Sequence, residues 1–171
     1  MSPAQEKQKI NEADMYAEDV RKGQEKIILV FGLNEENFGL DVRDIREIVR
    51  VPPVITRVPN APSYIKGVIN LRGTIVPVLD ISIRIGSDSN EVTSESRIIV
   101  VEYSDVLFGI LVDNVREVNT IYESQIEQVT DLESSVDQEF MRGVAKMDDG
   151  RLIVLLDLPG LFQIEVLVDE R

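Results

Sequence analysis

Polar and apolar residues alternate along residues 64–71, and this period of two is typical of a strand with one buried face. Residues 74–79 are apolar at almost every position, which predicts a second strand that is buried on both faces. The turn between them is Asn70–Gly73, and its last residue, Gly73, can adopt a positive φ. The pattern therefore predicts a β-hairpin with the cation of Arg72 at its tip.

Shorter apolar runs on either side of this hairpin predict further strands. They lie at Ile27–Phe31, Phe38–Val42 and Val54–Val58, where β-branched and aromatic residues are frequent. Over Val42–Val49 the apolar residues instead recur with helical spacing, which predicts a single helical turn. The pair Pro52-Pro53 then ends this turn.

Four segments complete the organisation of the chain. Residues 82–96 are rich in Ser, Asp and Asn, and we expect an exposed linker there. Residues 1–24 are predicted to be a flexible acidic and polar tail, and residues 163–171 a C-terminal tail. Asp157–Phe162 offers an Asp cap followed by an early Pro, which predicts the start of a helix.

The second half of the chain repeats the first. A shift of 70 residues aligns residues 27–49 with 97–119 without a gap, and a slightly larger shift aligns the hairpin with residues 142–157. The identical positions of the first block are Ile28/Ile98, Val30/Val100, Phe38/Phe108, Gly39/Gly109, Val42/Val112, Arg46/Arg116 and Glu47/Glu117. An internal repeat of this kind implies two similar lobes.

Each copy of the repeat contains about five short strands, which is the pattern of a small barrel. The chain is therefore expected to be mainly β, with two similar small five-stranded β-barrel lobes around a shared core and with short helical turns. We expect one domain over residues 25–162. Its first copy spans 27–81, its linker 82–96 and its second copy 97–158.

The composition removes most catalytic chemistries. The chain has 171 residues and contains neither Cys nor His, which excludes disulfides, Cys–His pairs, serine triads and zinc sites. Its net charge of −13 disfavours nucleic acid and anionic membrane surfaces as partners. The N-terminus lacks the apolar segment of a signal peptide, and no apolar run is long enough for a transmembrane helix. We expect a cytoplasmic protein without cofactor, metal or membrane insertion.

Positions kept in both copies are most simply explained by the shared fold. Gly67 and Gly143 are expected at bulges or at close approaches of the backbone. Asp80 and Asp157 follow the last strand of each copy, where a capping role is expected. The less favoured alternative is a hydrolase that uses these two carboxylates for acid–base catalysis.

Positions that differ between the copies are the better functional candidates. Asn70 aligns with Lys146, and the acidic turn Asp148-Asp149 lies where the first copy has Arg72. We therefore expect Arg72 to have no basic counterpart. Its guanidinium either pairs with a carboxylate such as Glu47 or contacts a partner, and the two roles can coincide.

These residues resemble the CheW-like domain family of bacterial chemotaxis coupling proteins. The signature segment is Tyr64-Ile-Lys-Gly-Val-Ile-Asn-Leu-Arg-Gly-Thr-Ile-Val-Pro-Val-Leu-Asp80. Supporting motifs are Phe38–Val42, Ile45–Ile48 and Phe108–Val112, and the resemblance runs from about Gln24 to Phe162.

The resemblance implies a scaffold or adaptor without catalytic activity, which links chemoreceptors to the histidine kinase CheA in membrane-associated arrays. It places the cytoplasmic tip of the receptor in a groove between the lobes, and the regulatory domain of the kinase at the ends of the barrels. The alternative is a CheW-like fragment of a larger signalling protein of the CheV or CheA type. By position, the receptor-facing residues are Ile45, Glu47, Ile48, Gly67, Asn70 and Arg72.

Overall fold

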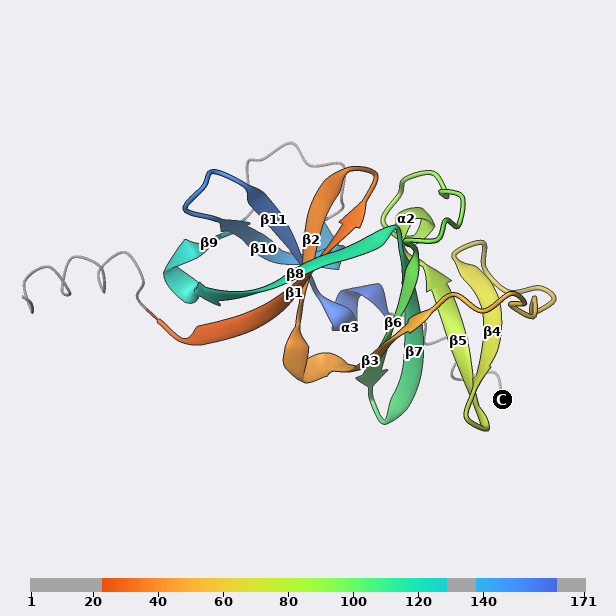
Figure 1. The fold of residues 1–171 in the computed structure, drawn as a ribbon. Coiled ribbons are helices and arrows are strands. Elements are labelled where there is room, and N and C mark those ends of the chain that lie inside the picture. The colour runs from red at the N-terminus through yellow and green to blue at the C-terminus, as the bar shows by residue number, and fades with distance from the viewer. Residues whose placement is uncertain (1–22, 129–137, 163–171) are drawn as a thin grey trace, which may run out of the picture.

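The computed structural model describes residues 23–128 and 138–162, and strands dominate it (Figure 1). The predicted tails lie outside the described residues, apart from Gly23 and Gln24. The strands are β1 (Glu25–Leu33), β2 (Glu36–Asp41), β3 (Ile45–Arg50), β4 (Ile65–Leu71), β5 (Thr74–Asp80), β6 (Arg97–Tyr103), β7 (Val106–Val112), β8 (Asn114–Tyr122), β9 (Ile126–Glu127), β10 (Met141–Lys146) and β11 (Leu152–Leu156). The short helices are η1 (Val42–Asp44), α2 (Ile81–Arg84), η2 (Glu123–Gln125), η3 (Gln138–Phe140) and α3 (Leu158–Leu161).

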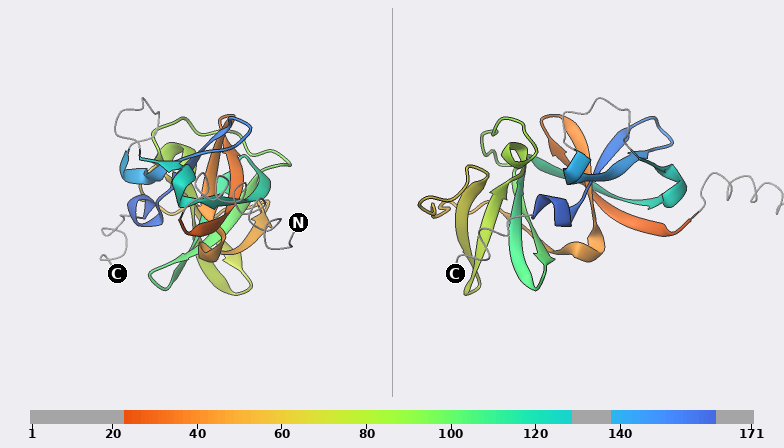
Figure 2. Two further views of the ribbon diagram at one scale, coloured as in Figure 1. Left: turned by 90° about the vertical axis from the view of Figure 1, so that its left-hand side faces the viewer. Right: turned by 180° about the vertical axis from the view of Figure 1, so that it is seen from behind.

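The strands form two sheets that lie side by side, with α3 between them in two opposite views (Figures 1 and 2). The six-stranded lobe has the order β8-β1-β2-β11-β10-β9, and the five-stranded lobe has the order β3-β6-β7-β5-β4. Neighbouring strands are antiparallel except for β2 with β11 and β7 with β5. The prediction of a mainly β chain with two similar lobes is confirmed. Neither sheet closes its ladder within the described part of the chain.

Each lobe combines strands from both copies of the repeat. The five-stranded lobe takes β3, β4 and β5 from the first copy and the hairpin β6–β7 from the second. The six-stranded lobe takes the hairpin β1–β2 from the first copy and β8 to β11 from the second. The two copies have therefore exchanged their N-terminal hairpins. The connections after β2 and β7 are too short to turn back, so they carry the chain across to the other lobe.

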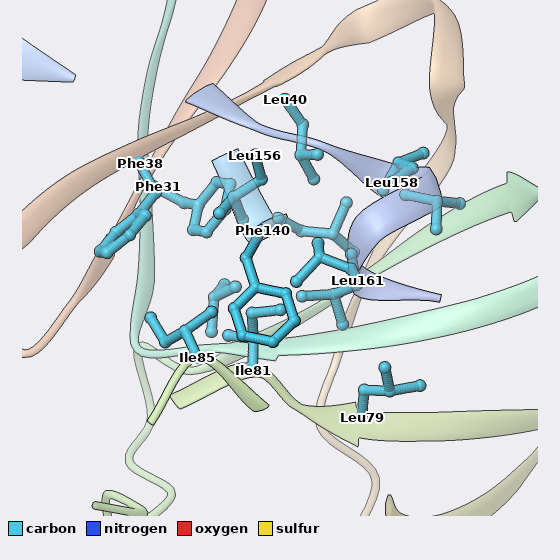
Figure 3. Packing of buried hydrophobic residues seen from close by; sticks show 14 of the residues in the cluster. Phe31, Phe38, Leu40, Leu79, Ile81, Ile85, Phe140, Leu156, Leu158 and Leu161 are labelled. Atoms are coloured by element: carbon cyan, nitrogen blue, oxygen red, sulfur yellow. The ribbon is translucent and has the colours of Figure 1, made fainter. Parts of the chain in front are cut away.

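The core is shared between the lobes because β1 and β6 are buried on both faces. Ile28 and Val30 point into the six-stranded lobe, whereas Leu29 and Phe31 point into a central cluster. The helical turns contribute Ile81 and other residues to this cluster, several of which Figure 3 shows packed together. Continuous apolar runs such as that of β1 are what burial on two faces requires.

Three predicted elements differ from the structure. The helical turn predicted over Val42–Val49 is wrong beyond η1, because Ile45–Arg50 forms strand β3 along β6. Its half-buried and exposed residues alternate, and the backbone of β6 provides the hydrogen bonds that a short helix would lack. The predicted strand over Val54–Val58 is reduced to one bridge, Thr56 with Val68. The predicted linker 82–96 begins inside α2.

The second strand of the predicted hairpin is buried on both faces only in part. β5 pairs with β7 over Val78–Asp80 alone, so its first residues extend beyond that neighbour. Ile75 is consequently 62% exposed.

The two carboxylates at the strand ends are helix caps, as predicted. Asp80 accepts a hydrogen bond from the backbone N–H of Ile83, and Asp157 accepts one from that of Gly160. The predicted helix start at Asp157–Phe162 is confirmed as α3, with its Pro in the first turn. Both carboxylates are therefore engaged in holding helix N-termini.

The paired glycines also lie where the repeat places them. The ladders of β4 with β5 and of β10 with β11 each shift register at the glycine. A Cβ at Gly67 would lie 2.3 Å from the carbonyl oxygen of Thr56, and one at Gly143 would lie 2.9 Å from that of Glu127. Both predictions, a bulge and a close backbone approach, are confirmed.

Candidate functional site

The candidate site is built around an ion pair between Arg72 and Glu47. Glu47 lies on β3, and Arg72 lies in the turn between β4 and β5, so the pair joins the two outer strands of the five-stranded sheet. The hydrogen bond and the charge of Glu47 raise the pKa of the Arg72 guanidinium. The arginine side chain nevertheless remains 71% exposed, whereas that of Glu47 is 29% exposed. The pair holds the arginine in place without covering it.

The turn that carries Arg72 is itself well defined. Arg72 and Gly73 both have positive φ, 50° and 90°, as in the tight turns that match the twist of a hairpin. The side-chain oxygen of Asn70 accepts a hydrogen bond from the backbone N–H of Gly73 at 2.8 Å. The positive φ of Gly73 was predicted, whereas that of Arg72 was not.

The structure brings three of the six predicted receptor-facing residues together. Asn70 and Arg72 share the turn, and Glu47 is bound to Arg72. On β3, Ile45 is half-buried against the central cluster, and Ile48 is 41% exposed.

Gly67 lies apart from these surface residues. It is buried beneath the Ile55–Thr56 segment, where the close approach of Thr56 leaves no room for a side chain. Its place in the site is therefore to let that segment lie against β4.

The six-stranded lobe carries an equivalent ion pair that the sequence comparison missed. Glu117 occupies on β8 the position that Glu47 occupies on β3, and it pairs with Arg151. Arg151 also binds Asp149 in its own turn. The prediction that Arg72 has no basic counterpart is therefore wrong. Arg151 follows Gly150 whereas Arg72 precedes Gly73, so a residue-by-residue alignment does not pair the two arginines.

Exposed apolar residues also occupy equivalent places in the two lobes. Ile75 on β5 and Leu152 on β11 are 62% and 52% exposed, and Ile48 on β3 and Val118 on β8 are 41% and 59% exposed. Only Ile48 was among the predicted site residues. The repeat alignment contained the signal for the others, because it pairs these positions.

A surface pocket of the five-stranded lobe lies beside the segment that follows β3. It has a volume of about 590 Å³, and its lining includes Val51, Ile55, Val58 and Val92. Within the described residues no group of three or more acidic side chains is arranged to hold a metal ion. No helix of the described part is long and apolar enough to cross a membrane. This surface pocket lies at the end of the hairpin opposite to the turn that carries Arg72.

Comparisons with known proteins identify the family of the chain. The family model of the CheW-like domain matches residues 28–166. The chemotaxis protein CheW of Rhizobium meliloti is 35% identical over 81% of this chain and 88% of its own length. That of Thermotoga maritima is 35% identical over 84% of this chain and 91% of its own length.

A solved structure gives the same result for the fold. The scaffolding protein TtCheW from Thermoanaerobacter tengcongensis has a TM-score of 0.75 and 40% identity, over 84% of this chain and 91% of that one. CheW proteins are non-catalytic scaffolds of chemotaxis signalling, so the hydrolase alternative for Asp80 and Asp157 falls away. On the match over residues 28–166 and these two relatives, the chain belongs to the CheW-like domain family.

Proposed function

We propose that this chain couples chemoreceptors to the histidine kinase CheA, as a scaffold that binds both and transforms neither. Membership of the CheW-like family supports this role. The observation that carries it is the Glu47–Arg72 pair, which fixes a largely exposed guanidinium on a rigid turn. A side chain that is already ordered loses little conformational entropy when a partner binds it.

The receptor would bind at the predicted residues on β3 and on the turn of the hairpin. The cytoplasmic tip of a chemoreceptor is a helical bundle, and a helix docks through apolar contacts that are flanked by a few charges. Ile48 offers apolar area, and Asn70 and Arg72 offer polar groups. Ile45 and Gly67 would contribute indirectly. Ile45 packs β3 against the core, and Gly67 allows the Ile55–Thr56 segment to lie against β4.

The regulatory domain of CheA would bind at the lobes themselves. Ile75 and Leu152 expose apolar area at equivalent positions, so each lobe presents a similar contact to a similar partner domain. Two weak contacts of this kind are reinforced when many copies assemble in an array. We therefore place the chain in membrane-associated receptor arrays, where it would be recruited through these partners without inserting into the membrane itself.

We also propose residues 25–162 as the domain that carries both contacts. A CheW-like segment of a CheV-type or CheA-type protein would use the same surfaces, joined to further domains.

A pull-down that uses each partner alone and then both together tests the function. The probes are a receptor cytoplasmic fragment and the regulatory domain of CheA. We expect each to be retained alone and both to be retained together. Mutually exclusive binding, or retention of neither probe, would contradict the coupling role.

A further inference from the structure

Three arginines gather where the chain crosses between the lobes, although the protein as a whole carries a net charge of −13. Arg50 on β3 and Arg97 on β6 lie directly opposite each other at the end of their ladder. Like charges in such a pair destabilise a sheet. Arg116 lies near the start of β8, the strand that continues from this crossing. Among the described residues, none of the three makes an ion pair with a carboxylate.

Arg97 and Arg116 are held in place by neutral acceptors. The guanidinium of Arg97 donates to the carbonyl oxygens of Ser94 and Ser96, at 2.8 and 2.7 Å. That of Arg116 donates to the side-chain oxygen of Asn114 at 3.0 Å and to that of Asn37. These bonds fix the positions of both guanidinium groups, and none of the acceptors carries a charge.

A glycine makes room for one of these arginines. A Cβ at Gly32 would lie 2.6 Å from the side-chain oxygen of Asn114 and 2.8 Å from Nη2 of Arg116. Any side chain at this position of β1 would therefore push the guanidinium out of its place. The missing side chain at Gly32 thus leaves room for the guanidinium of Arg116, and the two amide oxygens hold it there.

The two fixed arginines line one surface pocket of about 360 Å³. Arg97 begins β6 in the five-stranded lobe, and Arg116 belongs to β8 in the six-stranded lobe, so the pocket lies at the junction of the lobes. The remaining lining residues are Glu95, Asn114 and Val115. Glu95 is the single carboxylate of the lining, and it forms no ion pair with either arginine in the described structure.

We propose that this cationic pocket binds acidic side chains of a partner protein. Guanidinium groups with free N–H donors bind carboxylates with paired hydrogen bonds. A nucleic acid fits less well, because the net negative charge of the chain repels a long phosphate backbone. The partner is the chemoreceptor tip, since β3 carries Glu47 and Ile48 of the proposed receptor site and also ends at Arg50. This choice of partner rests on the proposed function.

The test is the affinity for a receptor cytoplasmic fragment, measured across a range of salt concentrations. The variant is Arg97→Gln with Arg116→Gln, which keeps polar side chains and removes two charges. At low salt we expect its binding to be about tenfold weaker than that of the wild type, because charge-assisted hydrogen bonds are lost. Its affinity should also depend less on salt, because fewer charges take part.

Two further variants make the result specific. Arg43→Gln removes an exposed arginine that is already paired with Asp41, and it should leave both the affinity and its salt dependence unchanged. Gly32→Ala keeps every charge and displaces Arg116, and it should weaken binding by a smaller factor than the double substitution does. Circular dichroism and thermal melting confirm that each variant is folded.

The outcomes separate this inference from the proposed function. If the folded double variant binds the fragment with wild-type affinity and salt dependence while Arg72→Glu abolishes binding, the pocket assignment is wrong and the coupling role stands. If the effect appears with the CheA regulatory domain alone, the choice of the receptor is wrong. Binding of a short single-stranded oligonucleotide that is equally sensitive to the substitutions would overturn the assignment to an acidic protein. A wild-type protein that binds neither partner contradicts the proposed function itself.

Discussion

The hairpins β4–β5 and β10–β11 occupy the same place in the two lobes, and they use their arginines differently. Arg151 binds two carboxylates, Glu117 and Asp149, and its side chain is 38% exposed. Arg72 binds Glu47 alone and is 71% exposed. An ion pair between an outer strand and the turn of the hairpin is therefore common to both lobes. The first hairpin differs in that the side chain of Arg72 remains largely exposed to solvent.

The turns of these hairpins differ in a second way. In the first turn, the neutral amide of Asn70 accepts the hydrogen bond from the backbone. In the second turn, the carboxylate of Asp149 does so, from the backbone N–H of Arg151. A duplicated fold thus keeps in both copies the contacts that stabilise each lobe. The copies differ in the polar groups that remain exposed after these contacts are made.

The largest effect is expected from the glycine that both hairpins share. A methyl group at Gly67 would meet the Thr56 carbonyl at 2.3 Å, and backbone cannot move aside as a side chain can. Gly67→Ala should therefore lower the free energy of unfolding by about 2–3 kcal/mol, measured by urea denaturation. Gly73→Ala is the control, because no atom lies within 4 Å of its Cβ, and it should lose only about 1 kcal/mol through its positive φ. Equal losses would contradict the close approach.

Charge reversal at the two arginines tests whether the lobes differ in function. Arg72→Glu should reduce the affinity for a receptor fragment at least about tenfold, because it removes the exposed cation and places a carboxylate beside Glu47. Arg151→Glu breaks the matching ion pair and should leave that affinity unchanged. Isothermal titration of both folded variants measures this difference. Wild-type receptor binding by Arg72→Glu would remove Arg72 from the site.

The exposed apolar pair provides a third comparison, in which the lobes should behave alike. Ile75→Asp and Leu152→Asp should each weaken binding to the CheA regulatory domain by about fivefold, because each removes apolar contact area. Both residues are largely exposed, so stability should change by less than about 0.5 kcal/mol. Surface plasmon resonance with immobilised kinase domain is the measurement. An effect at one position alone would limit the kinase contact to one lobe.

The smallest effect is a difference in acid sensitivity between the turns. The backbone hydrogen bond from Arg151 lowers the pKa of Asp149 below its usual 3.8. The ionised carboxylate of Asp149 therefore stabilises the folded state above pH 3.8. This stabilisation is lost as the pH falls through the lower pKa that Asp149 has in the folded protein. The amide of Asn70 does not titrate. Hydrogen exchange should thus show the backbone N–H of Arg151 losing protection in acid while that of Gly73 keeps it. Parallel behaviour of both amides would contradict the assignment.

Local patterns were sufficient to predict the hairpin, the helix caps and the glycine positions, and they offered Glu47 as one possible partner of Arg72. Each of these depends on a few neighbouring residues or on one repeated position. The strand at Ile45–Arg50 was missed because apolar residues four apart fit a helix and also fit alternate positions of a strand. Arg151 was missed because an ion pair requires only that the guanidinium lie close to the carboxylate. A long arginine side chain can reach the same place from either of two neighbouring positions of a turn, whereas a sequence alignment compares single positions.

The exchange of hairpins could not be predicted either. The same apolar pattern in β1–β2 and β6–β7 fits the sheet of either copy, so the alignment identifies equivalent strands without showing which of them pair. Only the short connections η1 and Asp113 decide the pairing, because they cannot reverse the chain within one lobe. This constraint depends on the length of the connections, and the hydrophobic pattern does not show it.

The exchange also determines how the molecule can be divided. A cut in the loop between α2 and β6 would give two fragments, and each would lack strands in both lobes. Neither fragment could bury the two faces of its N-terminal hairpin alone, yet together they contain every strand of the complete fold. Two such halves would therefore have to associate before either lobe had all of its strands.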